Sequence, residues 1–140
     1  MTTANIPGLG TVLINGDGRT LYYLSSEAGG KVTCTDANGC TAVWPDSELS
    51  PPVTAATAGP GVQASLLGTT KGPTGDTYAT YGGYPLYTFI KDTAPGQAHG
   101  QGITSFGGTW GALTPAGVPA TGKPTAATTA TTAAASGGGY

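Results

Sequence analysis

Two stretches of the chain share a short pattern from which the rest of the sequence can be interpreted. Residues 85–92 read PLYTFIKD, and residues 20–27 read TLYYLSSE. Each contains Leu-Tyr, one further residue, a large apolar residue, two more residues and a carboxylate. A tryptophan follows the tyrosine of each stretch, Trp44 after 22 residues and Trp110 after 23. An internal repeat of this kind indicates a chain built from two similar halves.

The segments around both stretches have the composition of β-strands. Residues 11–14 (TVLI) lead through Asn-Gly-Asp-Gly at 15–18 into residues 20–24, which predicts a hairpin because Asn-Gly and Asp-Gly tolerate positive φ. Pro and Gly interrupt the chain too often for long helices. The second half is expected to repeat the scheme with strands at 62–70, 77–81 and 84–90. We therefore expect an all-β fold, an antiparallel β-sandwich or a small barrel, made of two similar repeats with long Gly/Pro-rich loops.

The expected β domain covers residues 8–118, with repeat one at about 8–50 and repeat two at about 62–116. Residues 119–140 are rich in Thr, Ala and Gly and contain almost no large apolar side chain. Such a segment buries too little surface to offset its ordering entropy, so we expect a low-complexity tail that is disordered on its own.

Charge and hydropathy exclude two classes of partner. Charged residues make up 9% of the chain, the formal net charge is −2, and no basic stripe is present, so we expect no nucleic-acid binding. No apolar run approaches the roughly 18 residues that a transmembrane helix needs. The first residues lack the basic and apolar regions of a signal peptide, which indicates either a cytosolic protein or a signal sequence absent from this chain.

The two cysteines enclose a polar turn. Cys34 and Cys40 are separated by TDANG, a spacing that allows a disulfide, and two free thiols are the alternative. A metal site would need further ligands, and His99 is the only histidine in the chain. It stands in a flexible loop, where we expect a solvated residue. We therefore predict a disulfide in an oxidising compartment and no metal site.

Six residues of the repeat are candidates for binding. They are the aromatic side chains and carboxylates that recur in both halves: Tyr22, Glu27, Trp44, Tyr87, Asp92 and Trp110. The aromatic residues are expected to form the core of each half, and the alternative is a platform for a glycan or a planar ligand. The carboxylates are expected to accept hydrogen bonds from loop N–H groups, and the alternative is a pair of carboxylates across a pseudo-two-fold axis. If function lies near the repeat, we expect it in the loops at residues 28–43 and 93–108.

The second stretch carries a resemblance to a known family. Residues 87–92 match Tyr-x-(Phe/Trp/Tyr)-x-x-Asp, the signature of the bacterial secreted-repeat lipoproteins of unknown function. The surrounding residues are similar as well, at 18–22 and 34–45 in the first half and at 84–87, 96–102 and 108–110 in the second. The first repeat departs from the signature, because Leu24 replaces the aromatic residue and Glu27 replaces Asp. The resemblance covers roughly residues 8–118.

The resemblance implies an exported, surface or lipid-anchored protein and no established chemistry. It also favours the disulfide and a signal sequence that is absent from this chain. No nucleophile elbow, phosphate loop or dinucleotide fingerprint occurs, so we expect no enzyme and no cofactor. We predict a non-catalytic extracytoplasmic surface or assembly module that forms a homo-oligomer or filament by strand addition of a terminal segment. The alternative is a lipoprotein domain that binds a small ligand, a cell-surface glycan or a metal.

Overall fold

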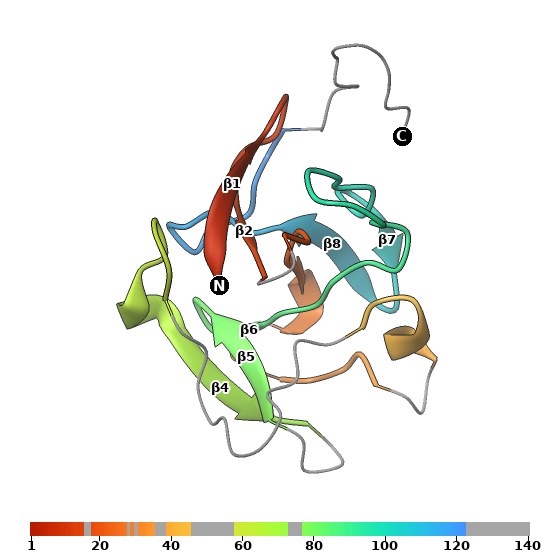
Figure 1. Ribbon diagram of the computed structural model, residues 1–140. Coiled ribbons are helices and arrows are strands. Elements are labelled where there is room, and N and C mark those ends of the chain that lie inside the picture. Colours follow the sequence, from red (N-terminus) through yellow and green to blue (C-terminus); the bar gives the residue numbers. More distant parts are fainter. Residues whose placement is uncertain are drawn as a thin grey trace.

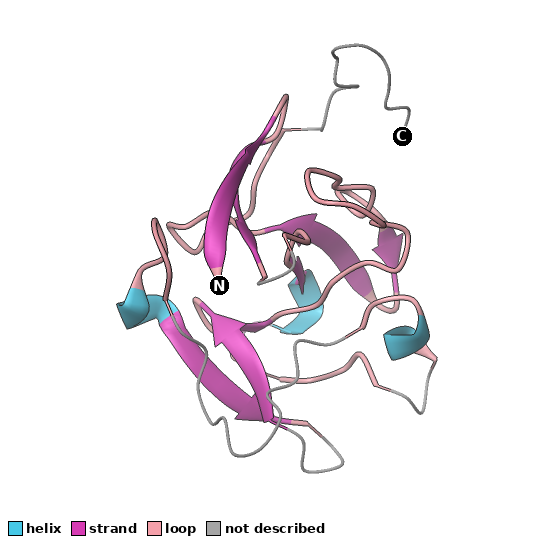
Figure 2. Cartoon of the chain, in the orientation of Figure 1, coloured by secondary structure: helices cyan, strands magenta, loops and turns pink. Residues whose placement is uncertain are grey.

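The computed structural model describes residues 1–15, 18–27, 29, 31–35, 39–45, 58–72 and 77–122 (Figure 1). Within these residues the fold is all-β, as the sequence predicted, with three antiparallel sheets and short 3-10 turns (Figure 2). None of the three sheets closes into a barrel, so the arrangement is consistent with a β-sandwich, the first of the two predicted architectures.

The chain begins with a hairpin. β1 (Thr2–Ile6) pairs antiparallel with β2 (Gly10–Ile14), with Thr2 opposite Ile14. β1 lies before the expected domain start at residue 8. The segment is paired with β2 within its own chain.

The predicted hairpin that follows is only partly formed. The Asn15 N–H donates to Arg19 O at 2.9 Å, and Ile14 forms an isolated bridge with Thr20. The chain then leaves this hairpin, because β3 (Tyr22–Leu24) pairs with β8 (Gly108–Ala112), which is distant in the sequence. All three residues of β3 are buried, so this strand belongs between two packed layers and not on a half-exposed hairpin.

The second half begins with the η3 turn (Ala64–Leu66) where the sequence predicted strand. A three-stranded sheet of β4 (Leu67–Lys71), β5 (Thr77–Tyr81) and β6 (Tyr84–Pro85) then follows. The predicted strand at 84–90 breaks after β6, and Tyr87 forms an isolated bridge with Tyr22. The predicted loop at 93–108 contains β7 (Thr104–Ser105), which forms a tight hairpin with β8 through Phe106-Gly107.

The two halves are related by an approximate two-fold axis. The β1–β2 hairpin corresponds to the β4–β5 hairpin, and the Leu21 N–H bond to Leu13 O corresponds to the Leu86 N–H bond to Ala79 O. At the axis, the N–H of each bridging tyrosine, Tyr22 and Tyr87, donates to the carbonyl of the other, at 2.7 and 3.0 Å. The repeat seen in the sequence is therefore a repeat of structure.

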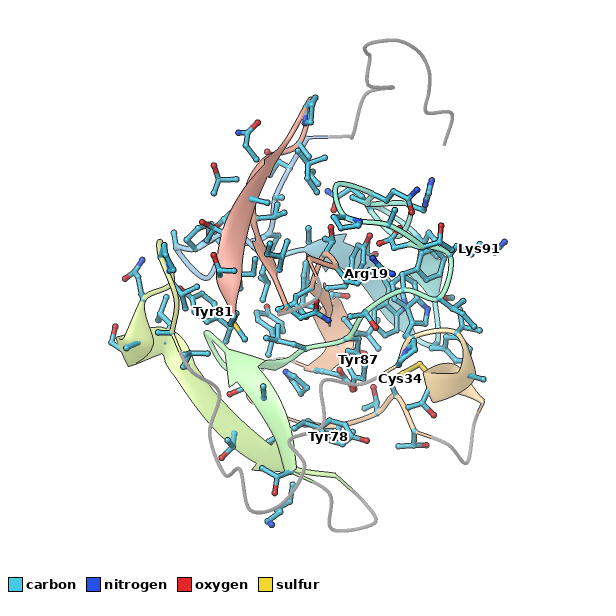
Figure 3. The ribbon with its side chains drawn as sticks, viewed as in Figure 1. Arg19, Cys34, Tyr78, Tyr81, Tyr87 and Lys91 are labelled. Carbon is cyan, nitrogen blue, oxygen red and sulfur yellow. A yellow bond between two sulfur atoms is a disulfide. The ribbon has the colours of Figure 1, made fainter. Side chains whose placement is uncertain are left out.

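The core divides into clusters around this axis. The largest contains the aromatic side chains of both repeats together with Cys34 and Cys40. A second cluster joins the two hairpins through Leu13, Tyr81 and Leu86, among others. Figure 3 shows Cys34 and Tyr87 close together in the interior, whereas Lys91 projects outward at the periphery. The candidate residues thus lie in the main core.

Candidate functional site

The structure brings all six candidate residues into the interior. Their exposed fractions range from 0% to 4%, so none forms an open platform on the surface. Two 3-10 turns lie beside the cluster: η1 (Ser25–Glu27) carries one carboxylate, and η2 (Cys40–Ala42) leads into Trp44. The aromatic residues form part of the core, as the sequence predicted.

Each tyrosine of the repeat binds the carboxylate of the other repeat. The Tyr22 hydroxyl donates to Asp92 Oδ2 at 2.5 Å, and the Tyr87 hydroxyl donates to Glu27 Oε2 at 2.9 Å. Among the described hydrogen bonds, none joins Glu27 to Asp92. The axis therefore relates two tyrosine–carboxylate pairs, whereas the sequence alternative placed the two carboxylates together.

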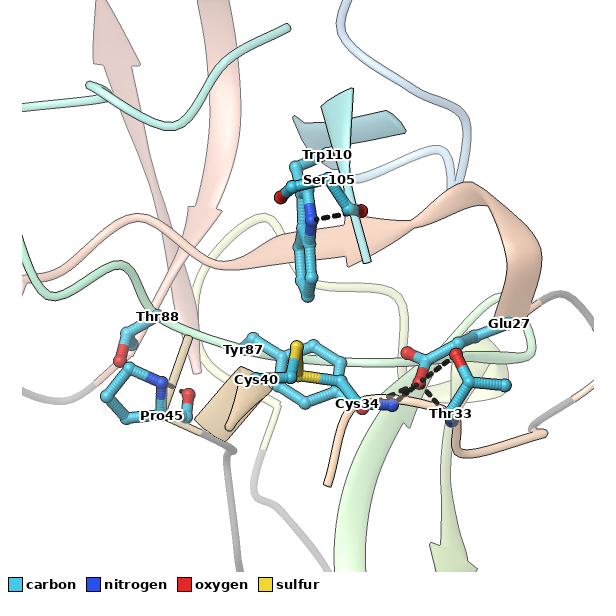
Figure 4. Close-up of a disulfide and its surroundings, with 9 residues drawn as sticks. All are labelled: Glu27, Thr33, Cys34, Cys40, Pro45, Tyr87, Thr88, Ser105 and Trp110. Atoms are coloured by element: carbon cyan, nitrogen blue, oxygen red, sulfur yellow. Dashed lines mark hydrogen bonds between the residues drawn. A yellow bond between two sulfur atoms is a disulfide. The ribbon is translucent and has the colours of Figure 1, made fainter. Parts of the chain in front are cut away.

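Glu27 also holds the loop that leads to the disulfide. Its Oε2 accepts the N–H groups of Thr33 at 2.6 Å and Cys34 at 2.9 Å, and the Thr33 hydroxyl at 3.2 Å (Figure 4). Its Oε1 is buried without a hydrogen-bond partner among the described residues. Burial raises the pKa of Glu27 above its usual value, although the hydrogen bonds to Oε2 act in the opposite direction.

Asp92 holds the corresponding loop of the second repeat. Its Oδ1 accepts the His99 N–H at 2.8 Å, seven residues later, just as Glu27 accepts the Cys34 N–H seven residues later. His99 Nδ1 lies 3.0 Å from Asp92 Oδ1 and 3.1 Å from Lys91 O. A carbonyl oxygen only accepts hydrogen bonds, so Nδ1 carries a proton and donates to both oxygens.

The expectation that His99 is a solvated loop residue is therefore wrong. Its side chain is part of the Asp92 site and is 22% exposed, which links this carboxylate to the surface. The equal spacing of Cys34 and His99 from the two carboxylates is the sequence signal that identifies this position. A comparison of the two halves residue by residue, beyond the eight-residue stretch, would have found it.

The aromatic side chains form a continuous array between the two carboxylates. Trp44 and Trp110 stack with ring centroids 3.9 Å apart and planes 3° apart. Tyr22 contacts Trp44 edge-on at 5.4 Å, and Tyr87 contacts Trp110 edge-on at 5.3 Å. The two halves of the array thus match across the two-fold axis.

Backbone pairing also joins segments of one repeat to segments of the other. Leu24 of the first repeat lies opposite Trp110 of the second in the β3–β8 ladder. The N–H groups of Thr88 and Ile90 donate to Pro45 O and Val43 O, at 2.8 and 3.0 Å, which places Phe89 opposite Trp44. The strand after each tyrosine therefore pairs with the tryptophan segment of the other repeat.

A glycine allows the second loop to approach the array. The N–H of Gly100 donates to the Tyr22 hydroxyl at 3.2 Å. A Cβ at this position would lie 2.7 Å from Trp44 Cη2 and 3.0 Å from Tyr22 Cε1, closer than real Cβ contacts. Any larger residue at position 100 would push the loop away from the tyrosine.

The predicted disulfide is present. Cys34 and Cys40 are bonded, with Cα atoms 5.1 Å apart, and both are fully buried. Figure 4 shows the disulfide beside Tyr87, with Glu27 hydrogen-bonded to Thr33 and Cys34 next to it. The disulfide and Glu27 together close the first loop, whereas Asp92 and His99 close the second without a covalent bond.

Two further features concern the part of the chain that the structure describes, metal-ligand clusters and membrane-spanning helices. No group of three or more His, Cys, Asp or Glu side chains there is arranged to hold a metal ion. Among the same residues, no helix is long and apolar enough to cross a membrane.

The fold and core define a disulfide-bonded β domain with two interlocked repeats. Residues 68–114, which span most of the second repeat, match the model of a family described as a secreted repeat of unknown function. The match confirms the resemblance to this family over residues 68–114, and a secreted family agrees with the disulfide. No curated protein and no solved structure matches the chain.

Proposed function

We propose that this domain is a non-catalytic surface or assembly module of the extracytoplasmic space that self-associates through its edge strands. The observation that carries the proposal is the sheet order, in which β1 and β4 are terminal strands of their sheets. Both lie at the periphery in Figure 1. A terminal strand presents backbone N–H and C=O groups that a second chain can pair with.

The two edge strands occupy equivalent positions but differ in sequence. β1 reads TTANI and β4 reads LGTTK. Pairing of β1 from one copy with β4 of the next is a head-to-tail contact, and such contacts extend into filaments when they do not close into a ring. The N-terminal segment therefore contributes from its place in the β1–β2 hairpin, with no need to leave the fold.

The composition of these edges supports the same proposal. Natural proteins block edge strands with charges, Lys above all, and with Pro. β1 contains neither, and β4 carries Lys71 at its end only. The side chains at the centre of both strands carry no charge.

The non-catalytic part of the proposal rests on how the core uses its carboxylates. Glu27 and Asp92 are the pair that an acid–base mechanism in the repeat would use. Both are buried and hydrogen-bonded to a tyrosine and to loop N–H groups. A ligand on the six candidate side chains would have to open the core, so the edges are the better-supported site of function.

Size-exclusion chromatography with light scattering and electron microscopy of the full chain test the assembly. We expect oligomers or filaments for the wild type and monomers for Asn5→Lys and Thr69→Lys, since both side chains are exposed and each variant places a charge within an edge strand. Ala116→Lys, at an exposed turn position, is the matched control and should assemble normally.

Two results would overturn this proposal. One is a wild-type chain that stays monomeric at every concentration. The other is assembly that survives both edge variants but disappears when the chain is truncated after residue 122, because the tail would then be the donor.

A further inference from the structure

The buried array has a property that packing alone does not require. Its rings follow one another in the order Tyr22, Trp44, Trp110 and Tyr87, with centroid separations of 5.4, 3.9 and 5.3 Å. Trp and Tyr are the side chains most easily oxidised by one electron after the thiols, and both cysteines here are already oxidised to a disulfide. The four rings therefore form an uninterrupted path for an electron vacancy through the centre of the domain.

In the described part of the chain, the tyrosines at the two ends of the path have a proton acceptor, whereas the tryptophans in its middle do not. Trp110 Nε1 donates to the carbonyl of Ser105 at 3.2 Å, and Trp44 Nε1 has no partner among the described residues. Neither indole therefore faces a base in this part of the chain. The two phenols donate to Asp92 and Glu27, which are bases positioned to take a proton over a hydrogen-bond distance.

The Asp92 end is prepared for this transfer. His99 donates both its N–H and its Nδ1–H to Asp92 Oδ1, which leaves Oδ2 for the Tyr22 hydroxyl. Asp92 Oδ2 accepts the hydrogen bond of the Tyr22 hydroxyl, so the accepting oxygen is already within hydrogen-bond distance of the phenol. The Gly100 N–H donates to the Tyr22 oxygen and remains there as a donor after the proton has moved.

We propose that the array is a one-electron relay that accepts oxidation from an outer-sphere one-electron oxidant at the surface and holds it as a neutral tyrosyl radical. In the step, the oxidant takes one electron from the array and is reduced by one charge. The phenol O–H bond breaks, its proton forms a new O–H bond on Asp92 Oδ2 or Glu27 Oε2, and the phenoxyl oxygen keeps one unpaired electron. Reduction of the radical returns the proton, so the cycle consumes only the oxidant and a reductant.

The roles of the residues follow from these contacts. The tryptophan pair carries the vacancy between the repeats, and the tyrosine at either end is where it rests, since only there does proton transfer neutralise the charge. A domain of this length has a radius of gyration of about 14 Å, so the core lies close to any oxidant at the surface. The relay is independent of the edge strands and stands or fails separately from the assembly.

Flash oxidation of the full chain by a photogenerated ruthenium(III) tris-bipyridine complex tests the proposal. We expect a tyrosyl radical in transient absorption and electron paramagnetic resonance, formed more slowly in D2O because a proton moves with the electron. Asp92→Asn combined with Glu27→Gln keeps acceptor oxygens but removes the bases, and should slow radical formation at least about tenfold.

Two further variants separate the relay from a structural role. Tyr22→Phe combined with Tyr87→Phe keeps the packing rings and should abolish most of the radical. Tyr84→Phe, outside the array on β6, is the matched control and should leave the radical unchanged. The proposal is overturned if the Tyr22/Tyr87 variant, folded by near-ultraviolet circular dichroism, still forms the radical at the wild-type yield. It is equally overturned if the signal is lost in Tyr84→Phe, or if the rate is the same in D2O and H2O.

Discussion

At the scale of single residues, the exchanged tyrosine–carboxylate pairs explain how an eight-residue stretch controls a much larger fold. The tyrosine and the carboxylate of one stretch lie five residues apart, but each finds its partner in the opposite repeat. A buried phenol or carboxylate without a partner costs free energy, so both repeats must be in place before either is satisfied. The stretch therefore holds the two repeats together and also contributes a strand to the core.

A double-mutant cycle can verify this exchange. We expect Tyr22→Phe to lower the free energy of unfolding by about 1.5–3 kcal/mol, the range for hydrogen bonds to charged groups. Tyr22→Phe should couple with Asp92→Asn, because the two side chains share a bond. It should be additive with Glu27→Gln within about 0.5 kcal/mol, since Glu27 bonds the other tyrosine. Urea unfolding of the single and double variants measures both terms, and coupling to Glu27 alone would contradict the exchange.

Glu27 predicts a pH dependence of stability. Because burial raises its pKa above the ordinary 4.5, the folded protein holds the Glu27 proton more tightly than the unfolded chain. Below 4.5 both states are protonated and the group has no effect. As the pH rises from there through the folded-state pKa, this residue destabilises the fold, and at higher pH the penalty stays constant.

Glu27→Gln isolates that contribution. We expect the difference in unfolding free energy between Glu27→Gln and the wild type to shift in favour of the variant as the pH rises above 4.5. Urea titrations of both proteins from pH 4 to 8 give the difference in unfolding free energy at each pH, and its change with pH is the shift. A difference that is flat with pH, or that moves in favour of the wild type, would contradict the raised pKa.

At the scale of elements, the hairpin of β7 and β8 contains a position where local geometry and residue type conflict. Phe106 has φ 52° and Gly107 has φ 88°, the two positive values that a two-residue type I′ turn needs. Asn or Gly is preferred at the first of these positions, and Phe there carries backbone strain. The ring is 37% exposed, so burial gives only part of the compensation.

Phe106→Asn should therefore stabilise the protein. We expect a gain of about 0.5–1 kcal/mol in unfolding free energy, because Asn-Gly adopts the turn without the strain. Thermal and urea unfolding give the value, and Phe106→Leu, which keeps an apolar side chain and the strain, is the control. A loss of stability in the Asn variant would show that the ring contributes more than the turn costs.

The limits of prediction at this scale have a physical origin. The Asn-Gly-Asp-Gly sequence correctly predicts a turn after residue 14, because the preference for a turn depends on local residues. It could not show that β3 would leave this hairpin, since the preference of Tyr22–Leu24 for β8 depends on partners 86 to 90 residues along the chain. The sequence does not predict strand β1, because TTANI has neither alternation nor bulk and its strand conformation comes from pairing with β2.

At the scale of the whole molecule, the repeat in the sequence predicted the symmetry but not the exchange. Matching residues in two halves indicates two similar units, and two units side by side would show the same pattern as two interlocked ones. The sequence identifies the candidate residues as a set that recurs in both halves. Their hydrogen-bond partners, however, depend on the path of the chain between the repeats. Interlocking also explains why Leu24 can replace an aromatic residue: it faces Trp110 in a ladder and does not have to repeat a ligand contact.

Interlocking predicts that the two repeats hold each other without a covalent link. A protease site introduced between residues 45 and 58 would separate the described parts of the two repeats when it is cleaved. We expect the fragments to stay together in native buffer, because the Tyr22–Tyr87 bridge, the β3–β8 ladder and both tyrosine–carboxylate pairs join one fragment to the other. Gel filtration before and after addition of urea measures this, with separation expected only in urea. Cutting the Tyr22→Phe/Tyr87→Phe variant should give a complex that dissociates at lower urea, whereas fragments that separate in native buffer would contradict the interlocked fold.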